Sequence, residues 1–448
     1  MFGYNYFMDN KTNILISGLT AAFLIHTSIY AKENSITETA NDANLSLSKD
    51  MIILPYVFST DSTGFAGGAA VIKQGLLQPQ TTLIASLMYG ATQNIITNDL
   101  EKEANFSGGF LDFTNYRLPF TDRTFFSFMG FKSYFPSSTN YLTNGYNNSV
   151  KEDALVSSGN SDFLNIRFRY VMPIGEGLDN PERLYSLKNG FVVDREGLGG
   201  GIPFETGFTS LGLKVFYQHE SYENSKYSPL DEWNTQGLRL FLEHDNTDYD
   251  LNPSRGYNFL VQYSKDFGNG VSLQSWDFLE ARYSHYLNLD TFSFTQQNVL
   301  ALNMWTGYSF SWDNDVQIDD TGLIDGHRPP PWEGARLGGF NRMRGYDNNR
   351  FSDKAAFYAG AEYRAVLNWN PLKKNDYIPV AVDWFQVVAF AEAGRVNDEY
   401  NFDLLSDMKY DVGISLRAMA AQIPVRVDVA YGDEGVNFWV MAYHPFDY

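Results

Sequence analysis

The stretch LGGFNRMRGYDNNR, residues 337–350, concentrates charge in a chain that is otherwise poor in charged residues. It carries three arginines and three glycines and follows shortly after the proline-rich HRPPPWEG. A buried arginine needs carboxylate partners, because an unpaired buried charge is costly. The planar guanidinium group of arginine can also donate hydrogen bonds to two carboxylates at once. The chemistry indicated is therefore an ion-pair network, with candidate carboxylates further along the chain at Glu362 and Glu392.

No enzyme motif accompanies these arginines. Cysteine is absent, which excludes thiol catalysis, disulfides and cysteine-based zinc sites. The sequence has no Gly-x-Ser-x-Gly elbow, no His-Glu-x-x-His motif, no Walker loop and no GxGxxG after a strand. The acidic run DNDVQIDD, residues 313–320, lacks the central Gly and final Glu of a Ca²⁺ loop, and we interpret it as a solvated extracellular loop. We expect no enzyme, no cofactor and no metal site.

Composition narrows the class of protein further. The chain has 448 residues, and Lys+Arg 33 against Asp+Glu 53 leaves a net charge of −20. This balance argues against a nucleic-acid partner, because phosphates need a basic face. The length is large for one ordinary globular domain but suits a single large β-barrel.

The N-terminus has the pattern of an export signal. Residues 13–25, NILISGLTAAFLI, form an apolar stretch of signal-peptide length, and SIYA follows, ending at Ala31. The alternative is a lone membrane anchor, but the stretch is short for a span and contains Ser17 and Thr20. We expect a signal peptide over 1–31, a disordered polar lead over 32–49 and one barrel domain over 50–448.

The rest of the chain repeats a β-strand pattern. Runs of about ten residues alternate aromatic or β-branched side chains with polar ones, and Asn, Gly, Asp or Pro turns separate the runs. In VRVDVA, residues 425–430, the valines oppose Arg426 and Asp428. A soluble sandwich also alternates. Charges in the middle of the polar face instead favour a barrel with a wet lumen and a lipid-facing outer surface.

The predicted fold class is all-β, a 16-stranded antiparallel transmembrane β-barrel with a long extracellular loop folded into the lumen. The expected strands lie near 51–59, 64–74, 81–91, 104–115, 123–135, 161–172, 204–219, 233–245, 256–267, 274–288, 291–309, 354–367, 383–395, 407–419, 423–431 and 436–446. Three links are long, at roughly 136–160, 173–203 and 310–353. If the first strand starts from the periplasm, the second long link falls on the periplasmic side. Turns should be short there, which indicates a miscounted strand.

The chain closes on FWVMAYHPFDY, an ending that is usual for outer-membrane barrels. Phe438, Val440, Ala442 and Phe446 share the apolar face of the expected last strand, and Tyr448 ends it. On that strand His444 is expected at the lipid interface rather than as a ligand.

Several motifs, in this order, resemble the BamA/TamA outer-membrane assembly-factor superfamily, the bacterial surface antigen family. Its mark is an Arg-Gly-aromatic tripeptide on a long extracellular loop, followed by a strand with Glu-x-Arg. Here these are Arg344, Gly345 and Tyr346, then Glu362 and Arg364. VVAFAEAGRV, residues 387–396, is similar to the next family motif, with Glu392 where the family more often has Asp.

Residues 241–259, FLEHDNTDYDLNPSRGYNF, are similar to the family's Asp-Asn…Pro-x-x-Gly hairpin through Asp245, Asn246, Pro253 and Gly256. LPYVFSTDSTGFAGGA resembles the family's first hairpin. The resemblance covers about residue 50 to the end of the chain.

These residues predict a specific arrangement in the lumen. We expect Arg344 to pin the loop to Glu362 and Glu392, which lie on the polar faces of the two following strands. Gly345 should permit the tight turn at the loop tip, and Tyr346 should pack against the inner wall. Arg342 and Arg350 are interpreted as rim or lumen charges without a dedicated role. Whether the pinned loop is only a staple or takes part in moving a substrate stays open.

The resemblance implies a function at the outer membrane of a Gram-negative bacterium. Larger members insert or translocate outer-membrane and secreted proteins, often with periplasmic repeat domains, and we expect this barrel to work without them. The first hypothesis is a stand-alone barrel that assists insertion or translocation of proteins or lipids. The alternative is a passive porin-like channel or structural surface antigen with a plug loop. Expected partners are outer-membrane lipid and lipopolysaccharide, and an unfolded client or a separate periplasmic partner. A seam with few hydrogen bonds between the first and last strands would favour the first hypothesis.

Overall fold

The structure is a computed structural model of the chain. It describes residues 36–39, 51–60, 62–97, 100–141, 145–193, 199–223, 232–313, 317–318, 324–325, 327–373, 382–420 and 423–446. The expected signal peptide, residues 1–31, lies outside the described residues.

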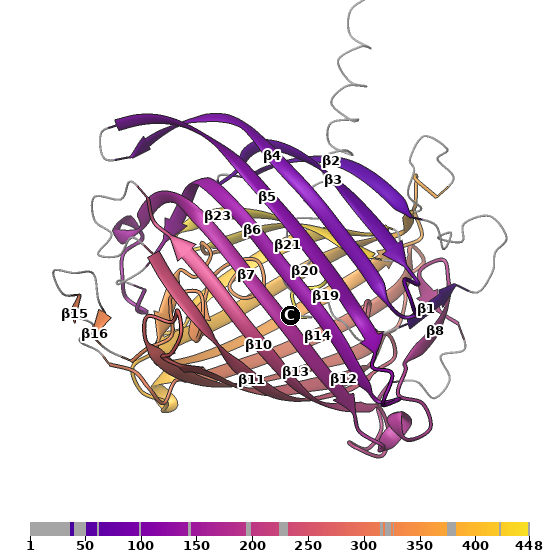
Figure 1. The fold of residues 1–448 in the computed structure, drawn as a ribbon. Helices are drawn as coiled ribbons and strands as arrows, with labels where there is room; N and C mark the ends of the chain where they lie inside the picture. The colour runs from indigo at the N-terminus through magenta and orange to yellow at the C-terminus, as the bar shows by residue number, and fades with distance from the viewer. Residues whose placement is uncertain are drawn as a thin grey trace, which may run out of the picture.

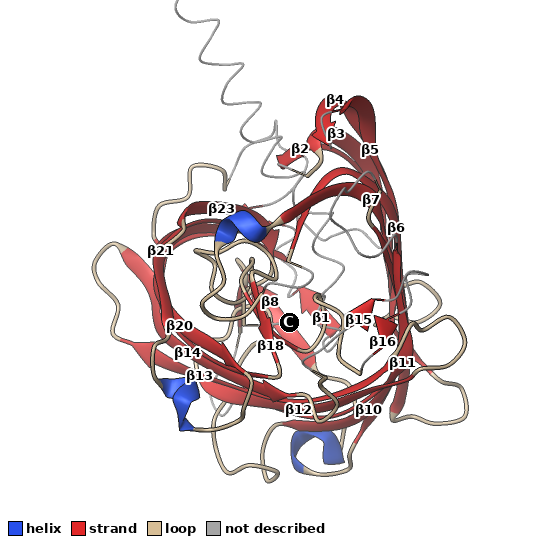
Figure 2. Ribbon diagram, turned by 90° about the vertical axis from the view of Figure 1, so that its left-hand side faces the viewer, coloured by secondary structure: helices blue, strands red, loops and turns tan. Residues whose placement is uncertain are grey.

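One antiparallel sheet of sixteen strands forms the wall of the molecule, and it curves into a barrel (Figures 1 and 2). Each strand pairs with its neighbours along the chain. The strands are β2 (Ile52–Thr60), β3 (Gly64–Gln74), β4 (Thr82–Thr97), β5 (Leu100–Arg117), β6 (Thr124–Asn140), β7 (Leu155–Val171), β10 (Phe208–Ser221), β11 (Glu232–Thr247), β12 (Gly256–Phe267), β13 (Ser275–Leu289), β14 (Thr295–Tyr308), β19 (Ala355–Leu367), β20 (Val382–Asn397), β21 (Lys409–Ala420), β22 (Ile423–Gly432) and β23 (Gly435–Ala442). The predicted fold class and strand number are confirmed.

The strands are apolar outside and charged inside. On β21, Val412, Ile414 and Leu416 are 54%, 63% and 46% exposed. Their neighbours Asp411 and Arg417 are 2% and 1% exposed. Successive side chains of a strand point to opposite faces, so the exposed set is the outer surface and the buried set is the lumen. This inversion of a soluble protein's pattern fits a wall surrounded by lipid.

The sheet curves round until its two end strands, β2 and β23, lie on the same side of the molecule (Figure 2). A buried apolar cluster joins side chains from both ends of the sheet. It includes Tyr56 and Phe58 of β2 and Val425 of β22, and Val440 of β23 packs against it. The two edges therefore approach each other from opposite ends of the chain.

The long link between β7 and β10 lies at the end of the barrel where β2 begins, which we call the near end. The inference of a miscounted strand there is wrong, because β7 and β10 pair directly through eleven residue pairs from Ser210↔Val171 to Glu220↔Ser161. The link instead carries structure of its own: η2 (Gly175–Leu178), β8 (Leu184–Lys188) and β9 (Phe191–Val192).

Strands β8 and β9 contact the opposite wall. Leu187 and Val192 belong to a buried cluster with Trp384 and Met419, which stand on β20 and β21. The Trp384 indole N–H donates to the Gly190 carbonyl at 3.2 Å. β7 and β10 are the sixth and seventh strands of the sheet, whereas β20 and β21 are the thirteenth and fourteenth. The link therefore reaches across the near end of the barrel.

A four-residue strand from the N-terminal lead extends this small sheet. β1 (Ile36–Thr39) pairs in parallel with β8, from Ile36↔Leu184 to Thr39↔Leu187 (Figure 1). The expectation of a disordered lead over 32–49 is therefore wrong for these four residues, because their backbone groups bond to the free edge of β8.

The last strand is shorter than predicted. β23 ends at Ala442, and Tyr443 takes a left-handed backbone with φ +59°. The following residues turn into the lumen, where Phe446 is fully buried in a cluster with Tyr286 and Val299 of β13 and β14. The expected strand over 436–446, with Phe446 among its outer apolar residues, is therefore wrong at its end. Among the described residues, no helix is long and apolar enough to cross a membrane.

The contact between Trp384 and the β8–β9 segment can be tested by substitution. Trp384→Ala removes a fully buried indole, and changes of this size in a core cost about 3–5 kcal/mol. We expect residues 184–192 to be cleaved faster by protease in the folded, detergent-solubilised barrel. Trp369→Ala is the matched control, because Trp369 is 64% exposed. Equal cleavage in the two variants would contradict the anchoring role.

Candidate functional site

The long link between β14 and β19 folds back into the barrel at the end opposite the near end, which we call the far end. Within it β17 (Ala335–Leu337) pairs with β18 (Phe351–Asp353), and this hairpin closes the loop tip 338–350. A second hairpin of the link joins β15 (Gln317–Ile318) to β16 (Ile324–Asp325). The tip is buried against the wall through a cluster that joins Met343 and Tyr346 to Trp305 and Tyr358. Tertiary packing thus carries the arginines of the tip into the lumen.

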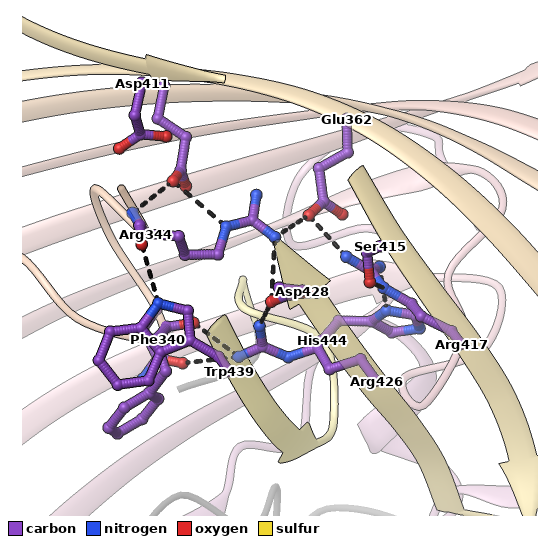
Figure 3. Close-up of polar contacts among 12 residues, drawn as sticks. Phe340, Arg344, Glu362, Asp411, Ser415, Arg417, Arg426, Asp428, Trp439 and His444 are labelled. Atoms are coloured by element: carbon purple, nitrogen blue, oxygen red, sulfur yellow. Dashed lines mark hydrogen bonds and ion pairs between the residues drawn. The ribbon is translucent and has the colours of Figure 1, made fainter. Parts of the chain in front are cut away.

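Arg344 lies at the centre of a buried ion network (Figure 3). Its Nη1 is 2.9 Å from Glu362 Oε1 and 3.5 Å from Asp428 Oδ2. Its Nε is 3.2 Å from Glu392 Oε2, and its backbone N–H donates to the same oxygen at 2.7 Å. The guanidinium carbon also lies 3.4 Å from the centre of the Phe390 ring. Both carboxylates expected from the sequence therefore contact Arg344, and Asp428 is a third.

The network continues across the inner faces of neighbouring strands. Glu362 also contacts Arg364 Nε at 2.8 Å and Arg417 Nη2 at 2.7 Å. Asp428 contacts Arg426, whose Nη2 donates to the Phe340 carbonyl of the loop at 2.6 Å. In a low dielectric these contacts are strong, and each charge would be costly without them.

The sequence interpretation did not assign Arg417 or Asp411 to this network. The ladder places Arg417 directly opposite Arg426, and Asp411 directly opposite Glu392. Alternation along residues 409–420 would have identified both as lumen-facing. Their partners, however, depend on the pairing of β20, β21 and β22.

Gly345 is required by close packing rather than by turn conformation. A Cβ on this residue would stand 2.6 Å from the Asp411 Cβ and 2.8 Å from the Gly432 backbone N. Its own backbone N–H donates to Asp411 Oδ2 at 3.1 Å. The left-handed residue of this turn is Met343, with φ +56°. The physical reason therefore differs from the one predicted, although glycine is needed in both cases.

Tyr346 packs inside the barrel and donates a hydrogen bond to the wall. Its hydroxyl donates to the Tyr410 carbonyl at 3.1 Å, and its ring meets Phe351 edge-on, with ring centres 5.1 Å apart. Burial raises the pKa of Tyr346 to about 12. The phenol therefore stays protonated and remains a donor at physiological pH.

The other two arginines of the segment also have defined places. The interpretation of Arg350 as a charge without a dedicated role is corrected by its contacts. It is fully buried, its Nη2 lies 2.6 Å from Glu434 Oε1, and its Nη1 donates to Ser149 Oγ at 2.7 Å. Arg350 therefore joins the loop to the link between β6 and β7. Arg342 stacks on Trp305, with its guanidinium carbon 3.7 Å from the ring centre.

The hairpin motif found in the sequence lies at the near end, away from Arg344. Asp245 contacts Arg183 Nη1 at 3.1 Å, and Asn246 Nδ2 donates to Thr206 Oγ1 at 2.8 Å. Gly256 has φ +95°, and a Cβ there would stand 2.0 Å from the Asn246 carbonyl oxygen. Pro253 lies in the turn between β11 and β12. The motif thus joins the β11–β12 turn to the β7–β10 link.

No group of three or more potential metal ligands occurs in the part of the chain that the structure describes. Most of the acidic run 313–320 lies outside that part, so its interpretation as a solvated loop remains a prediction. The chemistry visible in the lumen is therefore ion pairing between guanidinium and carboxylate groups.

The barrel, its outward apolar surface and its pinned lumen loop define a transmembrane barrel of the outer-membrane type. The Omp85 superfamily domain matches residues 101–438, well over half of the chain. The chain therefore belongs to the Omp85 superfamily, and it is a Gram-negative outer-membrane protein. The resemblance inferred from the sequence motifs is confirmed.

The chain is similar to several solved structures at low identity, and the fold is shared with the first of those that follow. CdiB from Escherichia coli is 10% identical with a TM-score of 0.51, and the match covers 87% of this chain and 61% of that one. CdiB from Acinetobacter baumannii is 13% identical with a TM-score of 0.47, covering 88% and 59%. BamA from Haemophilus ducreyi lacking POTRA domains 1–3 is 12% identical with a TM-score of 0.47, covering 93% and 76%. This chain thus spans less than two thirds of either CdiB chain. No curated protein matches the sequence.

Arg344→Ala tests the pinning of the loop. The substitution leaves Glu362, Glu392 and Asp428 short of a shared cation, and breaking a buried pair in this way costs about 3–5 kcal/mol. We expect the barrel to lose its heat-modifiable gel shift at a lower temperature, and the loop 309–354 to become protease-sensitive.

Arg395→Ala is the matched control, because Arg395 lies on β20 as Glu392 does but contacts the Ser406 carbonyl of the β20–β21 link at 2.7 Å. It should behave like the wild type. Unchanged heat-modifiability and protease resistance in Arg344→Ala would contradict the pinning role.

Proposed function

We propose that this barrel assists the insertion or translocation of proteins, or of lipids, at the outer membrane, and that it works at the seam between β2 and β23. The observation that carries the proposal is the strand order. In the sixteen-stranded sheet, as far as the structure describes it, β2 and β23 are the end strands, and no ladder joins them. Superfamily membership is consistent with this role.

An edge strand presents backbone N–H and C=O groups that can pair with an incoming strand. β23 has 8 residues and β2 has 9, whereas β4, β5, β6 and β7 have 16, 18, 17 and 17. The chain also leaves β23 at Tyr443 and turns into the lumen, so the near part of the β2 edge faces no continuing strand. A client strand added at this edge would find free backbone groups.

The lumen contents argue against the alternative of a passive open pore. The loop tip packs through Met343 and Tyr346 against the wall, and Arg344 is held by carboxylates of three strands. At the near end the β7–β10 link reaches Trp384. A porin-like channel would need an open lumen and a paired seam. A structural role for the plug loop is compatible with work at the seam.

Reconstitution in liposomes separates the two functions. Purified barrel would be assayed for its effect on the folding rate of an unfolded outer-membrane protein and, in parallel, for steady ion conductance. Faster client folding without steady conductance is the expected result. Steady conductance with no effect on client folding would overturn the proposal.

A covalent cross-link across the seam gives a sharper test in a chain without native cysteine. Ile53→Cys with Val440→Cys places one cysteine on each edge strand, and a bifunctional thiol reagent with a reducible linker joins the two. We expect the cross-link to abolish the acceleration of client folding and reductant to restore it. The matched control is Ile53→Cys with Val71→Cys, because Ile53 and Val71 already face each other in the β2–β3 ladder. Full activity of the cross-linked seam variant would refute the seam as the working edge.

A further inference from the structure

The lumen network divides into two sides with different charge balance. Glu362 is shared by three guanidinium groups, those of Arg344, Arg364 and Arg417. Asp428 is shared by Arg344 and Arg426. One carboxylate neutralises one cation. The two carboxylates Glu362 and Asp428 therefore cannot balance the three arginines Arg364, Arg417 and Arg426 that surround them.

The remaining carboxylates lie on the other side of Arg344. Glu392 contacts Arg344 and accepts a hydrogen bond from the Tyr358 hydroxyl at 2.5 Å. Asp411 lies opposite Glu392 and accepts from the Gly345 backbone. Within the described residues, neither of these acids forms an ion pair with Arg364, Arg417 or Arg426. Glu392 and Asp411 therefore do not balance the excess positive charge around Arg364.

Arg364 is the arginine of this network with two terminal nitrogens that have no hydrogen-bond acceptor. Its Nε contacts Glu362, but its Nη1 and Nη2 have no hydrogen-bond partner, and the side chain is fully buried. The rings of Tyr286 and Phe446 lie 5.5 and 5.3 Å from its guanidinium carbon. Leaving two charged N–H groups without acceptors in such a place is costly. An anion with two oxygen atoms can accept from both nitrogens at once.

Two further buried groups nearby have free polar atoms. Gln386 stands opposite Arg417 in the β20–β21 ladder, is fully buried, and has no partner for either its Nε2 or its Oε1. His444 Nδ1 lies 2.6 Å from Arg417 Nη1. Because a guanidinium only donates, His444 Nδ1 must accept, so the neutral ring carries its hydrogen on Nε2. That atom is buried and has no acceptor either.

We propose that this part of the lumen binds one small oxyanion, a carboxylate or a phosphate. The Arg364 Nη1 and Nη2 atoms bind two of its oxygens, and additional N–H groups come from Gln386 on the adjacent strand β20 and from His444 on the inward-turned segment after β23. The inward-turned residues 443–446 form its cover, because Phe446 lies over Arg364 and His444 over Arg417. The site is separate from the seam, so it can be present whether or not the seam accepts clients.

Equilibrium dialysis of the full-length barrel in detergent, refolded in chloride buffer, tests the site directly. Radiolabelled phosphate and radiolabelled acetate would be dialysed in separate arms. We expect about one anion per chain in at least one arm, and a higher thermal midpoint when that anion is present. Binding of acetate alone assigns a carboxylate ligand, and binding of phosphate alone assigns a phosphate. Binding in neither arm overturns the proposal.

Variants identify the residue that holds the anion. Arg364→Lys keeps the positive charge but loses the two-pronged donor, and we expect at least a tenfold weaker binding, about 1.4 kcal/mol. Arg342→Lys is the matched control, because Arg342 also lies in the lumen but stacks on Trp305. This variant should bind the anion as the wild type does. Phe446→Ala should speed release of the bound anion by removing its cover. Equal affinity in Arg364→Lys and wild type would overturn the assignment to Arg364.

Discussion

The structure depends on the requirement that charges carried into a barrel be paired there. Arg344 meets this requirement through Glu362, Glu392 and Asp428, which stand on β19, β20 and β22. In a low dielectric it is costly to break up this group of ion pairs, because removal of one charged side chain leaves the others unpaired. The network therefore ties one loop to three of the four strands from β19 to β22, and it specifies where the loop tip must lie.

The two halves of the barrel interior are held by different forces. The inner face around β19–β22 is charged, with Arg417 and Asp428 fully buried. The inner face around β2–β6 is instead an apolar cluster that includes Tyr56, Phe58 and Phe106. Directional ion pairs fix side-chain geometry more tightly than apolar contacts do. The seam lies where these two halves meet, so one of its edges adjoins a part of the wall that is specified by charge.

The chain also fills its barrel from both ends. The loop between β14 and β19 enters from the far end, the β7–β10 link reaches Trp384 at the near end, and residues 443–446 turn inward from β23. These segments supply hydrogen bonds and apolar contacts that the strands alone would leave unmade. A barrel filled in this way supports the proposed work at the seam over a passive open pore.

The sequence by itself determined the sixteen strands, because each one alternates apolar and polar residues between turn residues and needs only its neighbours to form. It also indicated Arg344 and two of its carboxylates, since charges at lumen-facing positions of a barrel require partners. Three features depended on tertiary structure: the place of Asp428 and Arg417 in the network, the anchoring of Arg350, and the inward turn at Tyr443. Each of these joins residues on segments far apart in sequence. Their contacts follow from the register and curvature of the whole sheet, which no local pattern contains.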